Sequence, residues 1–262
     1  MNEKREIQFG PVDQKRGGSS VGSLQGEVWL SVQTYQAQSL VRGRRSTEGK
    51  PAIMGLLGFA VQLNTLWQAV RMDDPYADWW LIKIEAAIAL CREHLSYLLE
   101  ELSALLESHS SFQISIAESS KPQRISLQFA NPYAFRGAQM LADYDRLMCL
   151  VMTVRHLGIG IPQDLNEQVD ASARRLRSVF ALPQGYHCCD IDRIAVMQGG
   201  QLGRNARERM GEVPEDILCG DRLPALRPVP FRAPLVVVSP SASSEGSQVN
   251  LESTYDTNPD AP

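Results

Sequence analysis

The longest regular pattern of apolar positions in this chain lies between residues 75 and 106. The apolar side chains recur there at alternating spacings of three and four residues, at Leu81, Ile84, Ile88, Cys91, Leu95, Leu98, Leu102 and Leu105. This spacing predicts one long amphipathic helix that buries a continuous stripe. Asp73, Asp74 and Asp78 lie around Pro75, and both proline and acidic side chains favour the first turn of a helix. We therefore expect these acids to mark the helix start.

Three short segments alternate between apolar and polar residues, as strands with one solvent-facing side do. They cover residues 26–34, 112–116 and 124–129. The second and third are separated by residues of turn composition, which predicts that these two form a β-hairpin. The polar side of the third segment would present Arg124, Ser126 and Gln128 to solvent.

Helical patterns account for most of the remaining chain. Helices are expected over residues 51–72, 162–180, 190–198 and 201–210, and over a long segment that Asn131 caps and Pro132 opens. The predicted fold class is α+β and predominantly helical, with a small antiparallel sheet, a long helix, several packed helices and a ribbon-helix-helix-like element.

Composition divides the chain into three parts. Residues 1–25 are rich in glycine, serine and charge and are expected to be a flexible lead, whereas residues 26–220 are expected to form one α+β domain. Residues 221–262 are rich in proline and serine and are expected to be a mostly disordered tail. No apolar run is long enough to span a bilayer and the N-terminus does not resemble a secretory signal, so a cytoplasmic protein is expected.

Charge is distributed unevenly around a formal net charge of −4. Residues 73–107 have a net charge of −6, whereas residues 172–211 and 1–50 have net charges of +4 and +3. Such separation can direct a polyanion to one face of an acidic protein. It is equally compatible with two helical segments that attract one another.

Residues with catalytic or metal-binding chemistry do not form a recognisable motif. His187, Cys188 and Cys189 lack the spacing that lets two thiolates reach one zinc ion. Asp73, Asp74 and Asp78 could hold a divalent cation, but their fit to a helix start explains them without one. The histidines occur without a nucleophile elbow, and Gly199–Arg204 lacks the spacing of a phosphate-binding loop. We therefore expect neither an enzyme nor a cofactor or metal site.

Residues 124–180 show a strand, helix, turn, helix order that is typical of ribbon-helix-helix proteins. In that fold, strands from two subunits pair and enter the major groove of DNA. Arginine and glutamine suit guanine and adenine edges, so Arg124, Ser126 and Gln128 are candidate base readers. Candidate phosphate contacts are Arg174, Arg175, Arg177, Arg204 and Arg207. The alternative for both groups is an ordinary solvated surface.

Three sequence blocks carry a family resemblance: the run Asp73–Trp80, the run Asn131–Ala138, and the pair Gly55 and Gly58. With Met210–Pro214, they resemble integrating conjugative element proteins grouped with AcaB-like transcriptional regulators, over roughly residues 26–232. The resemblance implies a gene on a mobile element with a role in conjugative transfer or its control. It also implies a DNA-binding regulator related to ribbon-helix-helix proteins.

Two functional hypotheses follow from these patterns. In the first, the protein is a homodimeric regulator that binds double-stranded DNA and controls conjugative-transfer genes. In the second, it is a non-enzymatic accessory protein of the conjugation machinery that acts through protein–protein contacts. A clustered basic face favours the first hypothesis, and a large apolar patch without one favours the second.

Overall fold

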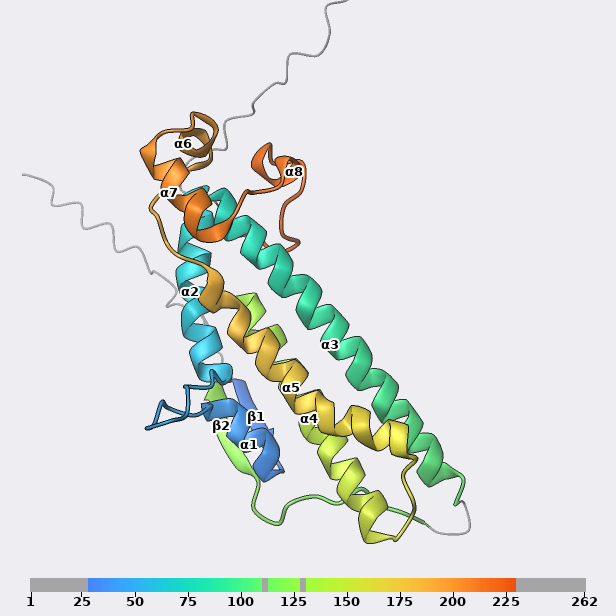
Figure 1. Ribbon diagram of the computed structural model, residues 1–262. Coiled ribbons are helices and arrows are strands. Elements are labelled where there is room, and N and C mark those ends of the chain that lie inside the picture. Colours follow the sequence, from blue (N-terminus) through green and yellow to red (C-terminus); the bar gives the residue numbers. More distant parts are fainter. Residues whose placement is uncertain (1–27, 110–112, 128–130, 230–262) are drawn as a thin grey trace, which may run out of the picture. The chain divides into compact units, whose positions relative to one another are not determined.

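The computed structural model describes residues 28–109, 113–127 and 131–229 of the chain (Figure 1). These residues divide into two compact units. Unit 1 comprises the described residues up to Asn64 together with Ile84–Gln184, and unit 2 comprises Thr65–Lys83 and the described residues from Gly185 onward. Whether residues 26–220 act as one domain stays a prediction.

Unit 1 contains the sheet and most of the long helices. Its elements are β1 (Val28–Val32), α1 (Tyr35–Arg42), β2 (Gln123–Leu127), α4 (Pro132–His156), α5 (Gln163–Ala181) and parts of α2 (Leu56–Arg71) and α3 (Pro75–Glu107). A short 3-10 helix, Leu182–Gly185, follows α5. Unit 2 contains the remainder of α2 and α3 with α6 (Arg193–Met197), α7 (Gln201–Met210) and α8 (Glu215–Leu218). The helical α+β class expected from the sequence is confirmed.

Helix α3 confirms the predicted long helix almost residue for residue, and it runs for 33 residues. The stripe from Leu81 to Leu102 is buried at every predicted position. Asp74 caps the helix, because its Oδ1 atom accepts hydrogen bonds from the backbone N–H groups of Tyr76 (2.8 Å) and Ala77 (3.4 Å). The expectation that these acids mark a helix start therefore holds for Asp74.

Helix α4 begins as predicted, at Pro132, with Asn131 as its N-cap. The Asn131 side chain accepts from the backbone N–H of Ala134 (2.9 Å) and donates to the Asn64 side chain of α2 (2.7 Å). Gly137 explains a second part of this block, because a Cβ atom there would lie 2.7 Å from the ring of Phe59. A larger residue would push α2 away from α4, so this glycine sets how closely the two helices pack.

The pairing of the strands differs from the prediction. Strand β2 pairs antiparallel with β1, from Val28 opposite Leu127 to Val32 opposite Gln123, and residues 113–119 form no strand. Two side chains instead satisfy backbone N–H groups of the latter segment: Thr153 accepts from Ala117 and Gln33 accepts from Ser119. The predicted hairpin of residues 112–116 with 124–129 is therefore wrong. Phe112, Gln128 and Phe129 lie outside the described residues.

This pairing also changes the ribbon-helix-helix expectation. The order β2, α4, α5 is present, but the strand partner of β2 comes from the same chain rather than from a second subunit. Burial explains the choice, because the pairing places Leu30, Val32 and Leu127 on the buried side of the ribbon. Alternation alone predicted these strands but could not select their partners.

Three helical boundaries also differ from expectation. Helix α1 was not predicted, and α2 begins at Leu56 rather than near Pro51 because the preceding residues form a small hairpin. Helix α6 covers only Arg193–Met197 of the expected 190–198 segment. Helices α5 and α7 confirm the predicted segments.

The carboxylate of Asp145 on α4 joins the sheet and α1 to the helical core. It accepts hydrogen bonds from the backbone N–H of Gln33 (2.6 Å) and from the backbone N–H (2.9 Å) and hydroxyl (2.6 Å) of Thr34. The Thr34 hydroxyl in turn accepts from the N–H of Ala37 and caps α1. Asp145 is 3% exposed. One buried side chain thus fixes the corner at which β1 becomes α1.

Substitution of Asp145 tests this role. We expect Asp145→Asn to lower the free energy of unfolding by about 2–4 kcal/mol, because the amide nitrogen of asparagine faces donors that need an acceptor. The control is Asp143→Asn on the same helix. Asp143 pairs with Arg92 at 3.0 Å in a partly exposed ion pair, so its loss should cost less than about 1 kcal/mol. Urea unfolding followed by circular dichroism measures both, and equal effects would contradict the assigned role.

Candidate functional site

The solvent-facing side of the β1–β2 ribbon is polar and partly aromatic. Trp29 and Ser31 of β1 and Arg124 and Ser126 of β2 are exposed, whereas Leu30, Val32 and Leu127 on the other face are buried. Arg124 lies opposite Ser31 in the register and diagonal to Trp29. Its guanidinium carbon is 5.2 Å from the centre of the Trp29 ring, within the range of a cation–π contact. The indole therefore supports Arg124 in an outward position.

The predicted base readers can be placed only in part. Arg124 and Ser126 lie on the exposed face of the ribbon, as the alternation predicted, whereas Gln128 lies outside the described residues. The contribution of Trp29, 47% exposed, was not anticipated. Its position in the alternating β1 segment was visible, but only the pairing of β1 with β2 brings it to Arg124.

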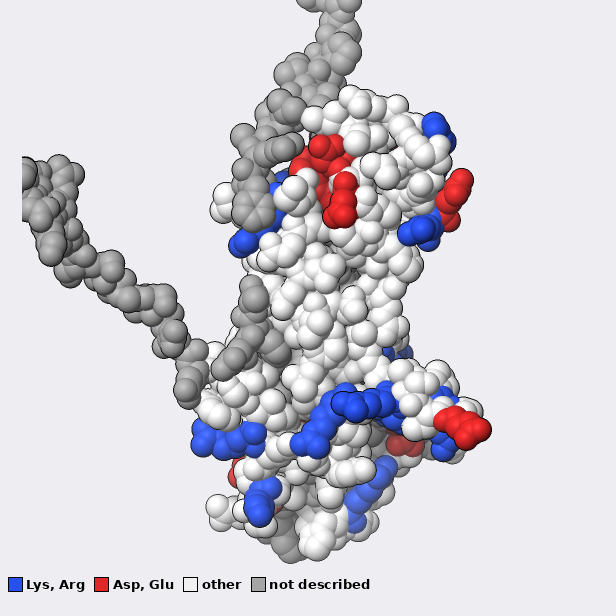
Figure 2. Space-filling model, turned by 90° about the vertical axis from the view of Figure 1, so that its left-hand side faces the viewer, with Lys and Arg blue, Asp and Glu red and all other residues white. Residues whose placement is uncertain are grey.

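A basic surface surrounds the ribbon in unit 1. Residues 28–53 and 113–127 contain six exposed cations, Arg42, Arg44, Arg45, Lys50, Lys121 and Arg124, against two exposed acids, Glu48 and Glu118. Figure 2 shows lysine and arginine side chains gathered over the part of unit 1 that contains β1 and α1. The sequence had shown a net positive charge over residues 1–50, but only the fold places the cations of residues 42–50 on the same unit as the ribbon.

The three predicted arginines of α5 do not share one direction. At about 100° per residue, Arg175 and Arg177 point to nearly opposite sides of a helix. In agreement, Arg175 acts electrostatically on His94 of α3 and Arg177 on Tyr144 of α4. Arg174 and Arg175 are exposed, and Arg177 is half-buried. These residues therefore do not form a single phosphate-binding row.

Arg204 and Arg207 lie on α7 in unit 2, not on the unit that contains the ribbon. The guanidinium of Arg204 donates to the carbonyl of Gly199 (2.9 Å) and to the side chain of Gln201 (2.8 Å). Arg207 forms an exposed ion pair with Glu212 at 3.3 Å. Both side chains thus have local roles around the ends of α7.

The acids at the start of α3 take part in a buried ionic cluster of unit 2. Asp78 is fully buried and pairs with Arg193 at 2.6 Å and with Arg227 at 3.2 Å. Asp73 pairs with the same two arginines, at 3.4 and 2.8 Å. Arg193 also donates to the carbonyls of Ile217 and Leu218 at the end of α8. Sequence reasoning missed this cluster, because Arg193 and Arg227 carry no local signal of burial.

Burial is the largest influence on the pKa values of Asp74 and Asp78 at the start of α3. The Asp74 carboxyl is 2% exposed, and desolvation raises its pKa from 3.8 to about 6, although hydrogen bonds from the Tyr186 hydroxyl and two backbone N–H groups oppose the shift. Desolvation also raises the pKa of Asp78, against the attraction of Arg227 and Arg193. These carboxyl groups stabilise the structure through defined partners rather than through exposure to a ligand.

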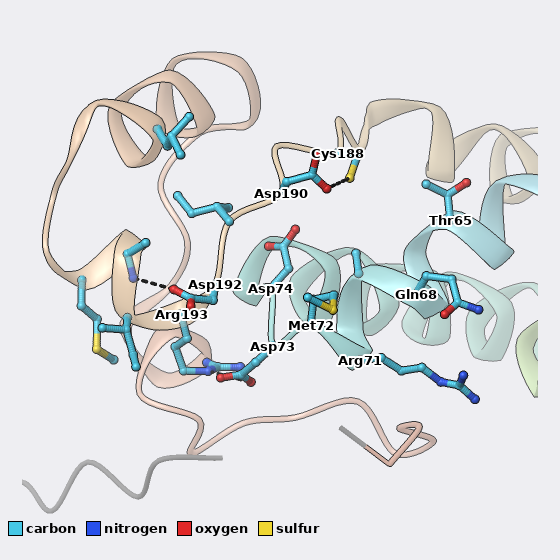
Figure 3. A pocket seen from close by; sticks show the side chains of 16 residues that line it. Thr65, Gln68, Arg71, Met72, Asp73, Asp74, Cys188, Asp190, Asp192 and Arg193 are labelled. Carbon is cyan, nitrogen blue, oxygen red and sulfur yellow. Dashed lines mark hydrogen bonds and ion pairs between the residues drawn. The ribbon is translucent and has the colours of Figure 1, made fainter. Parts of the chain in front are cut away.

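A pocket of about 610 Å³ lies beside this cluster, within unit 2 (Figure 3). Four carboxylates line it, those of Asp73, Asp74, Asp190 and Asp192. Each already has a partner: arginine for Asp73, Tyr186 for Asp74, the Cys188 thiol for Asp190, and the N–H of Ala195 for Asp192. The carboxylates that line the pocket are therefore already paired or hydrogen-bonded with other residues of the chain.

Within residues 28–109, 113–127 and 131–229, no group of three or more His, Cys, Asp or Glu side chains could hold a metal ion. Over the same ranges, no helix is long and apolar enough to cross a membrane.

Comparison with known proteins identifies the family. The family model described as transcriptional regulator AcaB matches residues 20–230. The chain belongs to the AcaB family of transcriptional regulators. The resemblance inferred from the three sequence blocks is thereby confirmed, and AcaB membership assigns the chain a regulatory role. A search of curated proteins gave no match.

A solved AcaB structure resembles this chain in fold. The crystal structure of selenomethionine-containing AcaB from uropathogenic E. coli is 17% identical to it, with a TM-score of 0.50. The alignment covers 75% of this chain and 95% of that chain. At this identity the likeness shows the fold alone, so the residue roles in this AcaB family member must come from its own geometry.

The raised pKa of Asp74 leads to a testable pH dependence. Because its pKa is higher in the folded chain, the neutral carboxyl stabilises unit 2 below about pH 4, and this contribution is lost as pH rises through about 6. Two pKa units correspond to roughly 3 kcal/mol. Asp74→Asn cannot titrate, yet its amide oxygen can still accept from the helix N–H groups.

We therefore expect the free energy of unfolding of the Asp74→Asn variant to fall less than that of the wild type between pH 4 and pH 7. Urea unfolding at several pH values measures the two slopes, with Asp143→Asn as the control for an exposed aspartate. Parallel slopes for the wild type and Asp74→Asn would refute the link between Asp74 and stability.

Proposed function

We propose that this protein is a DNA-binding transcriptional regulator, encoded by an integrating conjugative element, that acts in the cytoplasm on conjugative-transfer genes. The single observation that supports it best is the exposed β1–β2 ribbon, whose outer face presents Arg124 beside Trp29 within a basic surface. Membership of the AcaB family supplies the regulatory role. The mobile-element setting comes from the sequence blocks that resemble integrating conjugative element proteins.

The dimensions of the ribbon suit the major groove of DNA. Each strand has five residues, which corresponds to about 17 Å of extended chain. The major groove is about 12 Å wide and admits a two-stranded ribbon. Because β1 and β2 come from one chain, a single subunit can provide the whole ribbon. This differs from the two-subunit ribbon expected from the sequence and makes each subunit a complete reading unit.

The outer side chains of the ribbon suit base readout. The guanidinium group of Arg124 can donate two hydrogen bonds to a guanine edge, and the Ser126 hydroxyl can donate or accept. Because the Trp29 ring lies against Arg124, less side-chain freedom is lost when the arginine binds. Gln128 remains a proposed third reader, because it continues the sequence alternation of Arg124 and Ser126.

We further propose that the regulator binds DNA as a homodimer. One ribbon exposes few side chains that can reach base edges, and two subunits related by a twofold axis would read two half-sites. The overall charge of −4 limits non-specific attraction to DNA, so affinity depends on the local basic surface and falls steeply with salt.

The second candidate function is an accessory protein of the conjugation machinery. One observation favours it: on α3, Leu90 and Tyr97 are 67% and 44% exposed, respectively, and seven residues apart they share a helix face. A partner helix could cover this face. We prefer the regulator because the ribbon surface combines more side chains whose charge and hydrogen-bonding groups suit DNA.

The test combines chromatin immunoprecipitation with binding in solution. Immunoprecipitation of the tagged full chain from cells that contain the element should recover discrete DNA sites. Fluorescence anisotropy then measures affinity for a recovered duplex and for an unrelated one. We expect Arg124→Ala to weaken binding to the recovered duplex by about 5- to 150-fold, which corresponds to the loss of one good base contact. The affinity for the unrelated duplex should change far less.

The matched control is Arg222→Gln, an exposed cation in unit 2 that pairs weakly with Asp216 at 3.7 Å. Its affinity for both duplexes should stay near that of the wild type. Recovery of a transfer-machinery protein without DNA would reject the regulator and support the accessory role. Equal losses for Arg124→Ala and Arg222→Gln would reject readout by the ribbon.

A further inference from the structure

We propose that a small basic hairpin, residues 44–53, is a second DNA-contacting element that grips the sugar-phosphate backbone beside the ribbon. The inference rests on the proposed DNA-binding function and adds a partner surface that the ribbon does not include. The last residues of this segment, from Pro51 onward, were expected to begin a helix. The segment is instead a defined hairpin that projects from unit 1 between α1 and α2 (Figure 1).

The hairpin has a regular backbone. Arg44 and Ile53 exchange both of their backbone hydrogen bonds at 2.8 Å, and Thr47 and Lys50 exchange theirs at 3.1 and 2.9 Å. Gly49, with φ of 76°, allows the tight reversal at the tip. The guanidinium of Arg44 also donates to the carbonyl of Pro51 (3.1 Å). The segment is therefore held in one conformation by its own hydrogen bonds.

The root of the hairpin is fixed by two glycines in backbone contact. A Cβ atom on Gly43 would lie 2.2 Å from the carbonyl oxygen of Ile53, and one on Gly55 would lie 2.4 Å from the nitrogen of Gly43. Gly43 also has φ of 69°, which favours glycine. Immediately outside these glycines, Val41 and Leu56 are buried. The hairpin thus extends from the core of unit 1 on a rigid base.

Most of the hairpin buries no side chain. Every residue from Arg44 to Ala52 is exposed and none of these is a large apolar residue, whereas Ile53 at its end is half-buried. Its exposed side chains therefore add little to the stability of the core, although its backbone groups are hydrogen-bonded to one another. An exposed element with fixed geometry and three cations, Arg44, Arg45 and Lys50, is suited to contact a polyanion.

The position of the hairpin relative to the ribbon fits one duplex. Strand β1 leads through Thr34 directly into α1, whose eight residues span about 12 Å before Gly43. This distance is close to the width of the major groove. With the ribbon in the groove, the hairpin would lie against a flanking phosphate chain. Figure 2 shows several lysine and arginine side chains on one face of this part of unit 1.

Glu48, at the tip, favours contact of the hairpin with phosphates over its deep insertion into a groove. A carboxylate is repelled by the negative potential of a narrow minor groove. The flanking Arg45 and Lys50 can still reach phosphates from outside. The hairpin is therefore a clamp on the backbone, which strengthens binding to any sequence, and the ribbon supplies discrimination.

The test uses the full chain, the recovered duplex and an unrelated duplex, with affinities measured by fluorescence anisotropy at several salt concentrations. We expect the double variant Arg45→Gln with Lys50→Gln to weaken both duplexes by similar factors. The slope of log affinity against log salt should fall in magnitude by about two, because two phosphate contacts are removed.

A gain of affinity provides the second measurement, which misfolding cannot imitate. Glu48→Gln removes the repulsion between the tip and the phosphates, so both duplexes should bind about two- to fivefold more tightly at low salt. Glu100→Gln on α3 is the matched control, because it makes the same change in net charge at an exposed position away from the hairpin. It should leave affinity unchanged.

The possible results separate the two proposals. If the wild type binds and Arg124→Ala loses discrimination, but the hairpin variants behave as the wild type, the hairpin proposal is overturned and the regulator stands. Equal tightening by Glu48→Gln and Glu100→Gln also overturns the hairpin contact, because net charge alone then explains it. If the wild type binds neither duplex, the proposed function fails and the hairpin proposal fails with it.

Discussion

The buried carboxylate of Asp145 is the interaction on which the proposed DNA-binding surface depends. It accepts three hydrogen bonds from Gln33 and Thr34, at 2.6–2.9 Å, and so ties the end of β1 and the start of α1 to α4. A buried carboxylate is costly unless its oxygens are satisfied, and here the donors come from a segment more than 100 residues away. The ribbon strand β1 ends at this corner and α1, which leads to the basic hairpin, begins there, so the corner fixes the connection between the two.

In unit 2 the buried carboxylate of Asp78 is paired with arginines rather than with backbone N–H groups. The unit 2 cluster of Asp73, Asp78, Arg193 and Arg227 gathers the start of α3, the α6 segment and the chain after α8 around charges that are mostly out of water. Such pairs contribute little net stability compared with apolar packing, but loss of one partner leaves an unpaired buried charge. The cluster therefore specifies which segments meet. It explains the acidic run before Trp79 as an architectural feature.

The proposed regulator separates its tasks by charge. The chain is acidic overall, yet the described residues around the ribbon contain six exposed cations and two exposed acids. A local basic surface on an anionic protein favours binding where shape and base contacts add to phosphate attraction. In this arrangement Arg124 on its Trp29 support would discriminate between sequences, while the hairpin would add affinity without discrimination.

The sequence by itself determined the local elements whose signals lie within a few residues. The apolar stripe defined α3, the Asn131–Pro132 pair defined the start of α4, and alternation defined β1 and β2, because helix periodicity, capping and strand alternation are short-range properties. The blocks around Asp73 and Asn131 were also sufficient to suggest the family.

Only the tertiary structure decided which distant segments meet. It paired β2 with β1 instead of residues 112–116, brought Trp29 to Arg124, turned the expected start of α2 into a hairpin, and placed Arg204 and Arg207 in a different unit from the ribbon. The alternation of apolar and polar residues looks the same in every strand, so it does not identify the partner of a strand. An arginine likewise has the same sequence signal whether it is buried like Arg193 or exposed like Arg45. The choice depends on the burial of apolar area and on the satisfaction of buried polar groups across the whole unit, which no local pattern records.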